Sequence, residues 1–121
     1  MSATPPGWPR TVPPPGSPGW ERQAVAWLLD QCPPDYRGYA GWRRHPVALA
    51  WVAVRHVEAQ LAAMRQAYRE ARVDLGDLLT TEALTQVLED LEAEGVRLRA
   101  AERSARLLFE ALQGKRYIPR L

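Results

Sequence analysis

The 121-residue sequence has little of the chemistry that marks an enzyme or a metalloprotein. It contains one cysteine, Cys32, which excludes an internal disulfide framework. The two histidines, His45 and His56, match no structural zinc spacing, even when Cys32 is counted with them. None of the three serines lies in a nucleophile-elbow context, and no glycine-rich phosphate loop is present. We therefore predict no catalytic residues, no metal site and no cofactor.

Excess charge and long apolar runs are also absent. The formal net charge is +2 and hydrophobic residues make up 46%, a balance typical of a folded globular protein. The most apolar stretch, Pro46–Val54, is shorter than the roughly 20 residues that a membrane-spanning helix needs. The N-terminus lacks the basic and apolar regions of a secretory signal. These absences predict a cytoplasmic protein without membrane contact.

Proline is concentrated at the N-terminus. Seven of the eleven prolines fall in the first eighteen residues, so residues 1–17 are expected to form neither a helix nor a central strand. We predict an extended tail with polyproline-like character at residues 13–15. Trp8 favours a strap that packs on the folded body, whereas the two P-x-x-P motifs leave open a ligand for an aromatic groove. Residues 18–121 then form a single helical domain.

Apolar spacing predicts three helices in that domain. The first covers about 18–32, with Ser17 as N-cap and Pro18 at the first helical position. A loop follows at residues 33–45. The second helix covers about 46–73 and carries an unbroken heptad seam, which indicates coiled-coil-like packing. The third covers about 81–113, between a threonine N-cap at position 80 or 81 and a C-cap at Gly114.

The short connection between the two long helices, around Gly76, predicts an antiparallel hairpin. Residues 47–54 and 105–112 are apolar nearly all round, so both should be covered on several sides. We expect a packed base at that end and a thinner, more polar arm at the other. The fold class is therefore all-α, a short helix plus a long hairpin. Because three helices can leave a wide apolar stripe uncovered, a homodimer with a four-helix core remains an alternative.

The loop at residues 36–44 interleaves aromatic and basic side chains, including Trp42, Arg43 and Arg44. Such a composition can stack bases and bind phosphates, which makes a nucleic-acid-associated protein an alternative function. The other interpretation is that the aromatic residues pack onto the base while the arginines are solvated or pair with acids. Trp42, Arg43 and Arg44 are candidate partner-binding residues if the loop binds a partner, whereas the packing interpretation gives the loop a structural role only.

Acidic residues gather around the hairpin connection. The sequence D-L-G-D-L-L places Asp74 and Asp77 at the expected tip. This tip resembles that of coiled-coil factors that enter the secondary channel of RNA polymerase, in which acidic tip residues approach the catalytic magnesium. Leu79 stands where those factors usually have alanine, and their zinc-binding cysteine cluster is absent. The ordinary alternative is a polar turn between two helices.

Four further acidic residues are expected on a solvated face of the third helix and favour a basic protein surface as partner: Glu89, Asp90, Glu92 and Glu94. The segments PPGWP, VPPPG, WERQAVAWLLD and KRYIPRL resemble a group of short actinobacterial proteins without an assigned activity. That resemblance implies no site residue. The shape favours a non-enzymatic protein–protein interaction module, an adaptor or regulatory subunit, because long helical faces make docking surfaces and no concave polar pocket is implied.

Overall fold

The computed structural model describes residues 4–115, so the ends of the predicted tail (1–17) and helical domain (18–121) lie outside the described residues. The chain is all-α, as predicted, and no strand occurs within residues 4–115. Three helices and two short helical segments follow one another: α1 (Trp20–Asp30), the 3₁₀ helix η1 (Pro34–Gly38), α2 (Ala40–Arg44), α3 (Pro46–Leu75) and α4 (Thr81–Leu112).

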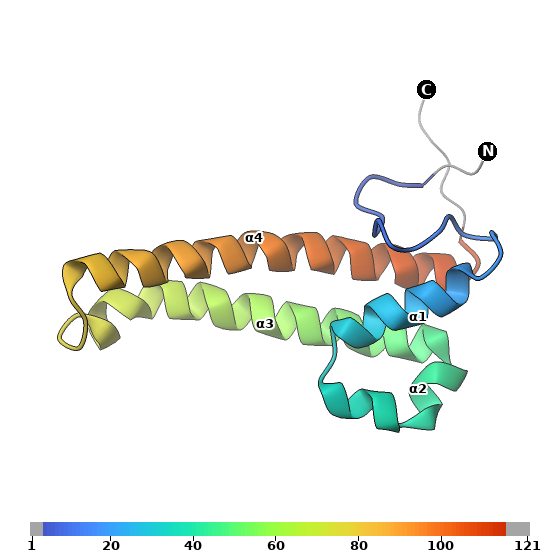
Figure 1. Cartoon of the computed structure of the whole chain (residues 1–121), viewed down its shortest axis with the longest axis horizontal. Coiled ribbons are helices and arrows are strands. Elements are labelled where there is room, and N and C mark those ends of the chain that lie inside the picture. The colour runs from blue at the N-terminus through green and yellow to red at the C-terminus, as the bar shows by residue number, and fades with distance from the viewer. Residues whose placement is uncertain (1–3, 116–121) are drawn as a thin grey trace.

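The two long helices form the predicted antiparallel hairpin. α3 and α4 run side by side along nearly their whole lengths (Figure 1). The Thr80 hydroxyl accepts a hydrogen bond from the Ala83 N–H at 3.1 Å, which confirms the N-cap of α4. At the other end Gly114 has φ 85° and the Lys115 N–H reaches back to the Glu110 carbonyl at 3.1 Å, as in a Schellman C-cap. Local capping therefore defines both ends of α4.

The start of α1 differs from the prediction. The helix begins two residues later than expected and ends two residues earlier. Gly19 has φ 79°, and the Trp20 N–H bonds to the Ser17 carbonyl at 3.2 Å, so Pro18 and Gly19 form a tight turn before the helix. Glycine at the third position of such a turn supplies the positive φ that it requires. The Ser17 hydroxyl instead donates to the Pro14 carbonyl, across the preceding turn, and makes no side-chain cap on α1.

The predicted loop at residues 33–45 contains η1 and α2. Its backbone closes in successive three-residue steps, since the N–H groups of Tyr36, Tyr39 and Trp42 bond to the carbonyls three residues earlier at 3.0–3.2 Å. Each segment is only five residues long. An apolar periodicity cannot develop over so short a length, so sequence spacing gave no indication of these helices.

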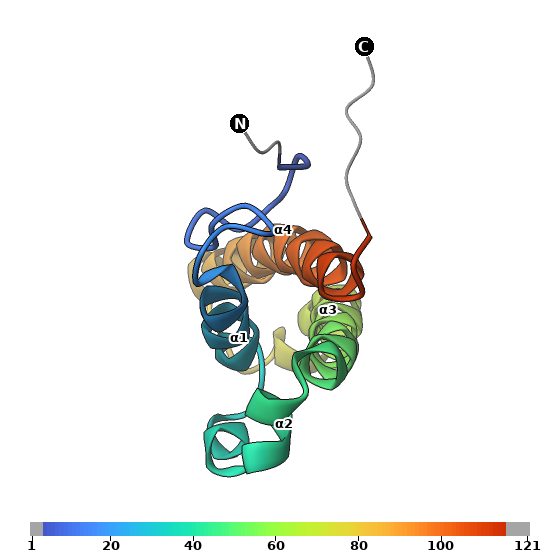
Figure 2. The same cartoon turned by 90° about the vertical axis from the view of Figure 1, so that its right-hand side faces the viewer.

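The N-terminal tail packs on the body as a strap, and its path consists of tight turns. Pro-Gly pairs form three of these turns, with φ 95° at Gly7, 86° at Gly16 and 79° at Gly19. The expected polyproline character therefore does not continue beyond Pro15. In the end-on view the tail lies over α4 and leads into α1 (Figure 2).

Two contacts with the body hold the strap in place, and a hydrogen bond within the strap supports them. The Val12 side chain is 3% exposed and belongs to the base cluster, while the Trp8 indole N–H donates to the Val12 carbonyl at 2.8 Å. The Ser104 hydroxyl on α4 donates to the Gly7 carbonyl at 2.6 Å. The strap thus covers part of α4 that would otherwise face solvent.

Buried side chains divide the molecule into the predicted base and arm. At the base, α1, α3 and α4 form a triangle in cross-section, with α2 beside them (Figure 2). Its core contains Val12, Ala24, Leu28, Leu29, Cys32, Leu49, Ala50, Ala53, Val54, Ala105 and Leu108. A second cluster follows along the hairpin: Val57, Leu61, Leu98 and Ala101, with Trp27 and Met64 against it. Beyond it, only Ala71 and Leu88 are buried. We call residues 58–100 the arm.

Candidate interaction surfaces

The aromatic residues of the 36–44 segment pack mainly against the protein itself. Tyr36 and Trp42 stack with ring centroids 5.1 Å apart and an interplanar angle of 4°. The Tyr36 hydroxyl is hydrogen-bonded to His56 Nε2 on α3 at 2.8 Å. Both rings are half-buried against the base, which agrees with the packing interpretation, while Tyr39 is 56% exposed. Tyr39 is therefore the aromatic residue of this segment that is most accessible for stacking.

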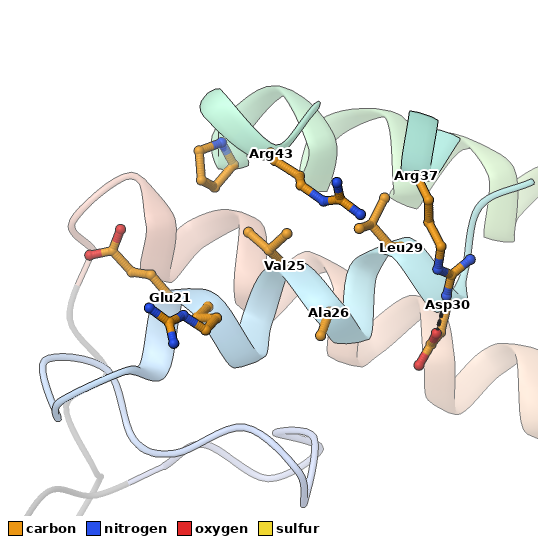
Figure 3. Close-up of a pocket in the computed structure, with 9 residues that line it drawn as sticks. Glu21, Val25, Ala26, Leu29, Asp30, Arg37 and Arg43 are labelled. Carbon is orange, nitrogen blue, oxygen red and sulfur yellow. Dashed lines mark hydrogen bonds and ion pairs between the residues drawn. The ribbon is translucent and has the colours of Figure 1, made fainter. Parts of the chain in front are cut away.

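Two arginines of the same segment, Arg37 and Arg43, border a cleft of about 560 Å³ between α1 and the η1–α2 segment. Arg37 pairs with Asp30 at 2.5 Å, and Arg43 extends over Leu29 (Figure 3). Glu21 lines the other end of the cleft, so its charges are mixed. Arg44 is exposed and lies outside the cleft. The cleft does not present the uniformly basic surface that phosphate binding favours.

Asp74 and Asp77 lie at the distal end of the hairpin, as predicted. Asp74 is in the last turn of α3, Asp77 follows in the connection, and both side chains are exposed. The conformation of the connection is helical up to Gly76, which has φ −57° and ψ −36°. The tip is thus an acidic, solvated turn, far along the hairpin from the base (Figure 1).

The other four acidic candidates are distributed around α4. Residues on a helix share a face when they are three or four apart. Asp90 and Glu94 therefore lie on one side of α4. Fourteen residues further along, the same side of the helix presents Ser104, which lies under the strap, and the buried Leu108. Glu89 and Glu92 lie elsewhere on the helix. Glu94 also forms an ion pair with Arg97. The Arg97 guanidinium donates a hydrogen bond to the Glu94 carboxylate, and this hydrogen bond lowers the pKa of the Glu94 carboxyl. These residues do not form a single acidic surface.

One side of the hairpin is left uncovered by the described residues. On α3, Leu49 and Ala53 are fully buried at the base, whereas Trp51 is 45% exposed. At 100° per residue, Trp51 lies on the opposite side of α3 from both. Figure 2 shows α1 on one side of the α3–α4 pair and no described element on the other. We call this other side the uncovered face.

A groove runs between α3 and α4 on the uncovered face of the arm. Two of its α3 residues continue the exposed side of the base, since Arg65 and Arg69 follow Trp51 and Arg55 by fourteen positions each. The groove has a volume of about 480 Å³ and is lined by Met64, Arg65, Tyr68, Arg69, Leu91, Glu92, Gly95, Val96 and Arg99. Tyr68 is 36% exposed and Val96 63%. Apolar surface at this position is thus open to solvent.

Gly95 leaves the groove hollow. It lies in the middle of α4, where glycine costs about 0.5–1 kcal/mol relative to alanine. A Cβ atom at this position would meet no heavy atom within 4 Å, so nothing in the described structure requires the glycine for packing. The missing side chain lowers the α4 wall of the groove.

The charges around the groove are predominantly basic. Arg65, Arg69 and Arg99 line it together with a single acid, Glu92. None of the three arginines forms an ion pair with another residue of the described range 4–115. Toward the base, by contrast, the same face is neutralised internally, because Arg106 pairs with Glu58 at 2.5 Å and lies near Glu102.

No protein-family model, curated protein or solved structure matches this chain. Its function therefore has to be inferred from the surfaces just described. Within residues 4–115 no helix has the length and apolarity needed to cross a membrane, and no three His, Cys, Asp or Glu side chains are grouped as metal ligands.

Cys32 is buried in the base core, and burial raises the pKa of its thiol to about 11. Desolvation is the cause of the rise, and the positive charge of Arg37 partly opposes it. Of the residues that line the groove, only Glu92 was among the sequence-based candidates, where it was expected on an acidic face. In the sequence, Gly95 lies between Leu91 and Leu98 in the middle of the third helix, and a glycine at such a position is the sequence feature that could have pointed to the groove.

Proposed function

We propose that this chain is a protein–protein interaction module, an adaptor or regulatory subunit, that docks a partner on the uncovered face of its arm. The supporting observation is the groove beside Gly95, which leaves Tyr68 and Val96 partly exposed on a face that no described element covers. Exposed apolar surface rimmed by polar residues is typical of interaction sites. The base supports this role by holding the two long helices rigidly at one end.

The chain itself contains an example of the binding mode. At the base, α1 lies along the α3–α4 pair on the opposite side, and its Trp27 packs against the cluster formed by Val57, Leu61, Leu98 and Ala101. A helix laid into the groove between two antiparallel helices is a common recognition mode. The uncovered face of the arm offers a second groove of this kind, without an occupant among the described residues.

Affinity capture from the native host tests the proposal, using the wild-type protein and Val96→Glu after nuclease treatment. The substitution puts a charge on the wall of the groove at a largely exposed helix position, so the fold should persist. We expect a partner protein whose recovery falls at least tenfold with Val96→Glu. Val73→Glu is the matched control, because Val73 is 84% exposed on the same arm and does not line the groove.

Two results would contradict this function. One is the absence of any protein whose capture depends on the groove. The other is binding to DNA or RNA that falls steeply with salt and is lost on Arg43→Ala and Arg44→Ala, which would favour the nucleic-acid alternative.

A further inference from the structure

We propose that the arm groove binds an acidic amphipathic helix supplied by a partner protein. This inference rests on the proposed function and adds the chemistry of the partner. Three properties of the groove lead to it: its shape, its apolar floor and the charge of its rim.

The shape fits a helix. On α4 the groove extends from Leu91 to Arg99, which is about 12 Å at 1.5 Å per residue, or somewhat more than two helical turns. A ligand helix lying along α3 and α4 would present apolar residues at positions i, i+3 or i+4, and i+7 to such a groove. Gly95 lies near the middle of this length, and the space above it is empty. A glycine there allows a second backbone or a large side chain to approach α4 closely.

The floor is suited to apolar side chains of varied shape. Met64 and Tyr68 come from α3 and Leu91 from α4, and none of the three is fully buried. Methionine is unbranched and adapts to irregular surfaces, while tyrosine offers a large, rigid contact area. Val96 forms the outer wall on α4. Filling this hollow would bury apolar surface that now faces solvent.

The rim selects the charge of the ligand. Arg65 and Arg69 stand on the α3 side and Arg99 on the α4 side, against Glu92 alone. Opposed charges at an interface favour encounter and suppress wrong partners. A helix flanked by Asp or Glu therefore complements the groove, and one flanked by Lys or Arg is repelled.

The same charges disfavour a second copy of this chain as the occupant. In a symmetric dimer built on this face, each groove would bring three arginines and one glutamate to the contact. Like charges placed together across an interface oppose association. The homodimer considered from the sequence thus becomes an alternative outcome of the test.

The test is selection from a displayed library of helical peptides of about three heptads. Apolar residues are fixed along one face, and the flanking positions are randomised among Glu, Gln and Lys. We expect selection on the wild-type protein to enrich Glu at flanking positions. In fluorescence anisotropy the enriched peptide should bind at least tenfold more tightly than its Lys counterpart, and salt should weaken the binding because exposed charges are screened.

Gly95→Leu separates binding from folding. Leucine has a much higher helix propensity than glycine, and its Cβ meets open space, so the variant should unfold at the same or a higher denaturant concentration. It should nevertheless lower the affinity for the enriched peptide at least tenfold, because the leucine side chain fills the hollow. The charge-reversed variant Arg65→Glu/Arg69→Glu should reverse the preference and bind the Lys peptide better than the wild-type protein does. Arg44→Glu is an exposed substitution outside the groove, and it should change neither the affinity for the enriched peptide nor the preference for Glu over Lys.

Several results would overturn the inference: no enrichment, enrichment of Lys, or binding that Gly95→Leu leaves unchanged. If sedimentation velocity shows a dimer that Val96→Glu abolishes, the occupant of the groove is a second copy of this chain and not a partner helix. The proposed function has its own test, and it is contradicted if capture from the host yields no protein whose recovery falls with Val96→Glu. If that capture succeeds and the library selection fails, the interaction function stands and the acidic helix does not.

Discussion

Leu61 offers the sharpest test of how the two long helices pack. It is 4% exposed and lies in the small cluster with Val57, Leu98 and Ala101, where the arm begins. Leu61→Ala removes three carbon atoms, worth about 0.8 kcal/mol each in transfer free energy. The cavity left behind raises the cost, and such substitutions span about 2–5 kcal/mol. Because the flexible Met64 lies against the cluster and can partly fill the space, we expect about 2.5–3.5 kcal/mol.

The measurement is equilibrium denaturant unfolding followed by far-UV circular dichroism. Leu78→Ala is the matched control, since Leu78 is 74% exposed near the tip and should change the free energy of unfolding by less than about 0.5 kcal/mol. Combining Leu61→Ala with Leu98→Ala should give a non-additive total, because the two side chains share one cluster. A loss below about 0.5 kcal/mol for Leu61→Ala would refute the packing of α3 on α4 described above.

Three further predictions concern the strap, a helix cap and the buried thiol. Deleting residues 1–17 should lower the melting temperature and increase binding of a hydrophobic dye, because Val12 leaves the base core; an unchanged melting curve would mean that the strap adds no stability. Thr80→Ala should cost about 1 kcal/mol in denaturant unfolding, whereas Thr80→Ser should retain most of the cap. The raised pKa of Cys32 should make alkylation near pH 8 about 100-fold slower in the folded than in the unfolded chain, and equal rates would contradict its burial. Folding favours the neutral Cys32 thiol, so the free energy of unfolding should include the full contribution of the thiol below its unfolded pKa of about 9. That contribution should be lost as the pH rises through about 11. The pH dependence of unfolding, compared between the wild-type protein and Cys32→Ala, measures it.

The hairpin could be predicted from the sequence because its determinants are local or periodic. The heptad seam of α3 persists over most of the helix, and Pro46 marks its start. Thr80 and Gly114 mark the ends of α4 through caps that involve neighbouring residues only. The division into base and arm followed from the two segments that are apolar nearly all round.

The predicted start of the first helix at residue 18 was wrong because two local rules compete at the same residues. Pro18 can occupy the first turn of a helix, but Pro18 followed by Gly19 also favours a turn with positive φ at the glycine. The structure has the turn, so the helix begins at Trp20. The predicted loop was wrong for a different reason, since η1 and α2 are each a single short segment without room for a repeating pattern.

The groove could not be predicted because it depends on which side of the hairpin α1 covers. The apolar stripes of both long helices were visible in the sequence, but the choice of covered side is made by tertiary contacts, such as Trp27 of α1 against the cluster that contains Leu61 and Leu98. Four acidic residues that are close together in the sequence, at positions 89, 90, 92 and 94, predicted one solvated acidic face. The 100° step of the helix separates Glu92 from Asp90 and Glu94, and places Glu92 beside the arginines of the groove.

Hydrogen exchange of the protein with and without its captured partner tests the central claim most directly. We predict that slowing of amide exchange on binding is concentrated in residues 64–69 of α3 and 91–99 of α4, the two walls of the groove. Exchange in residues 36–44 should stay the same. Protection confined to the 36–44 segment or to the strap, with the arm unaffected, would contradict the assignment of the groove as the docking site.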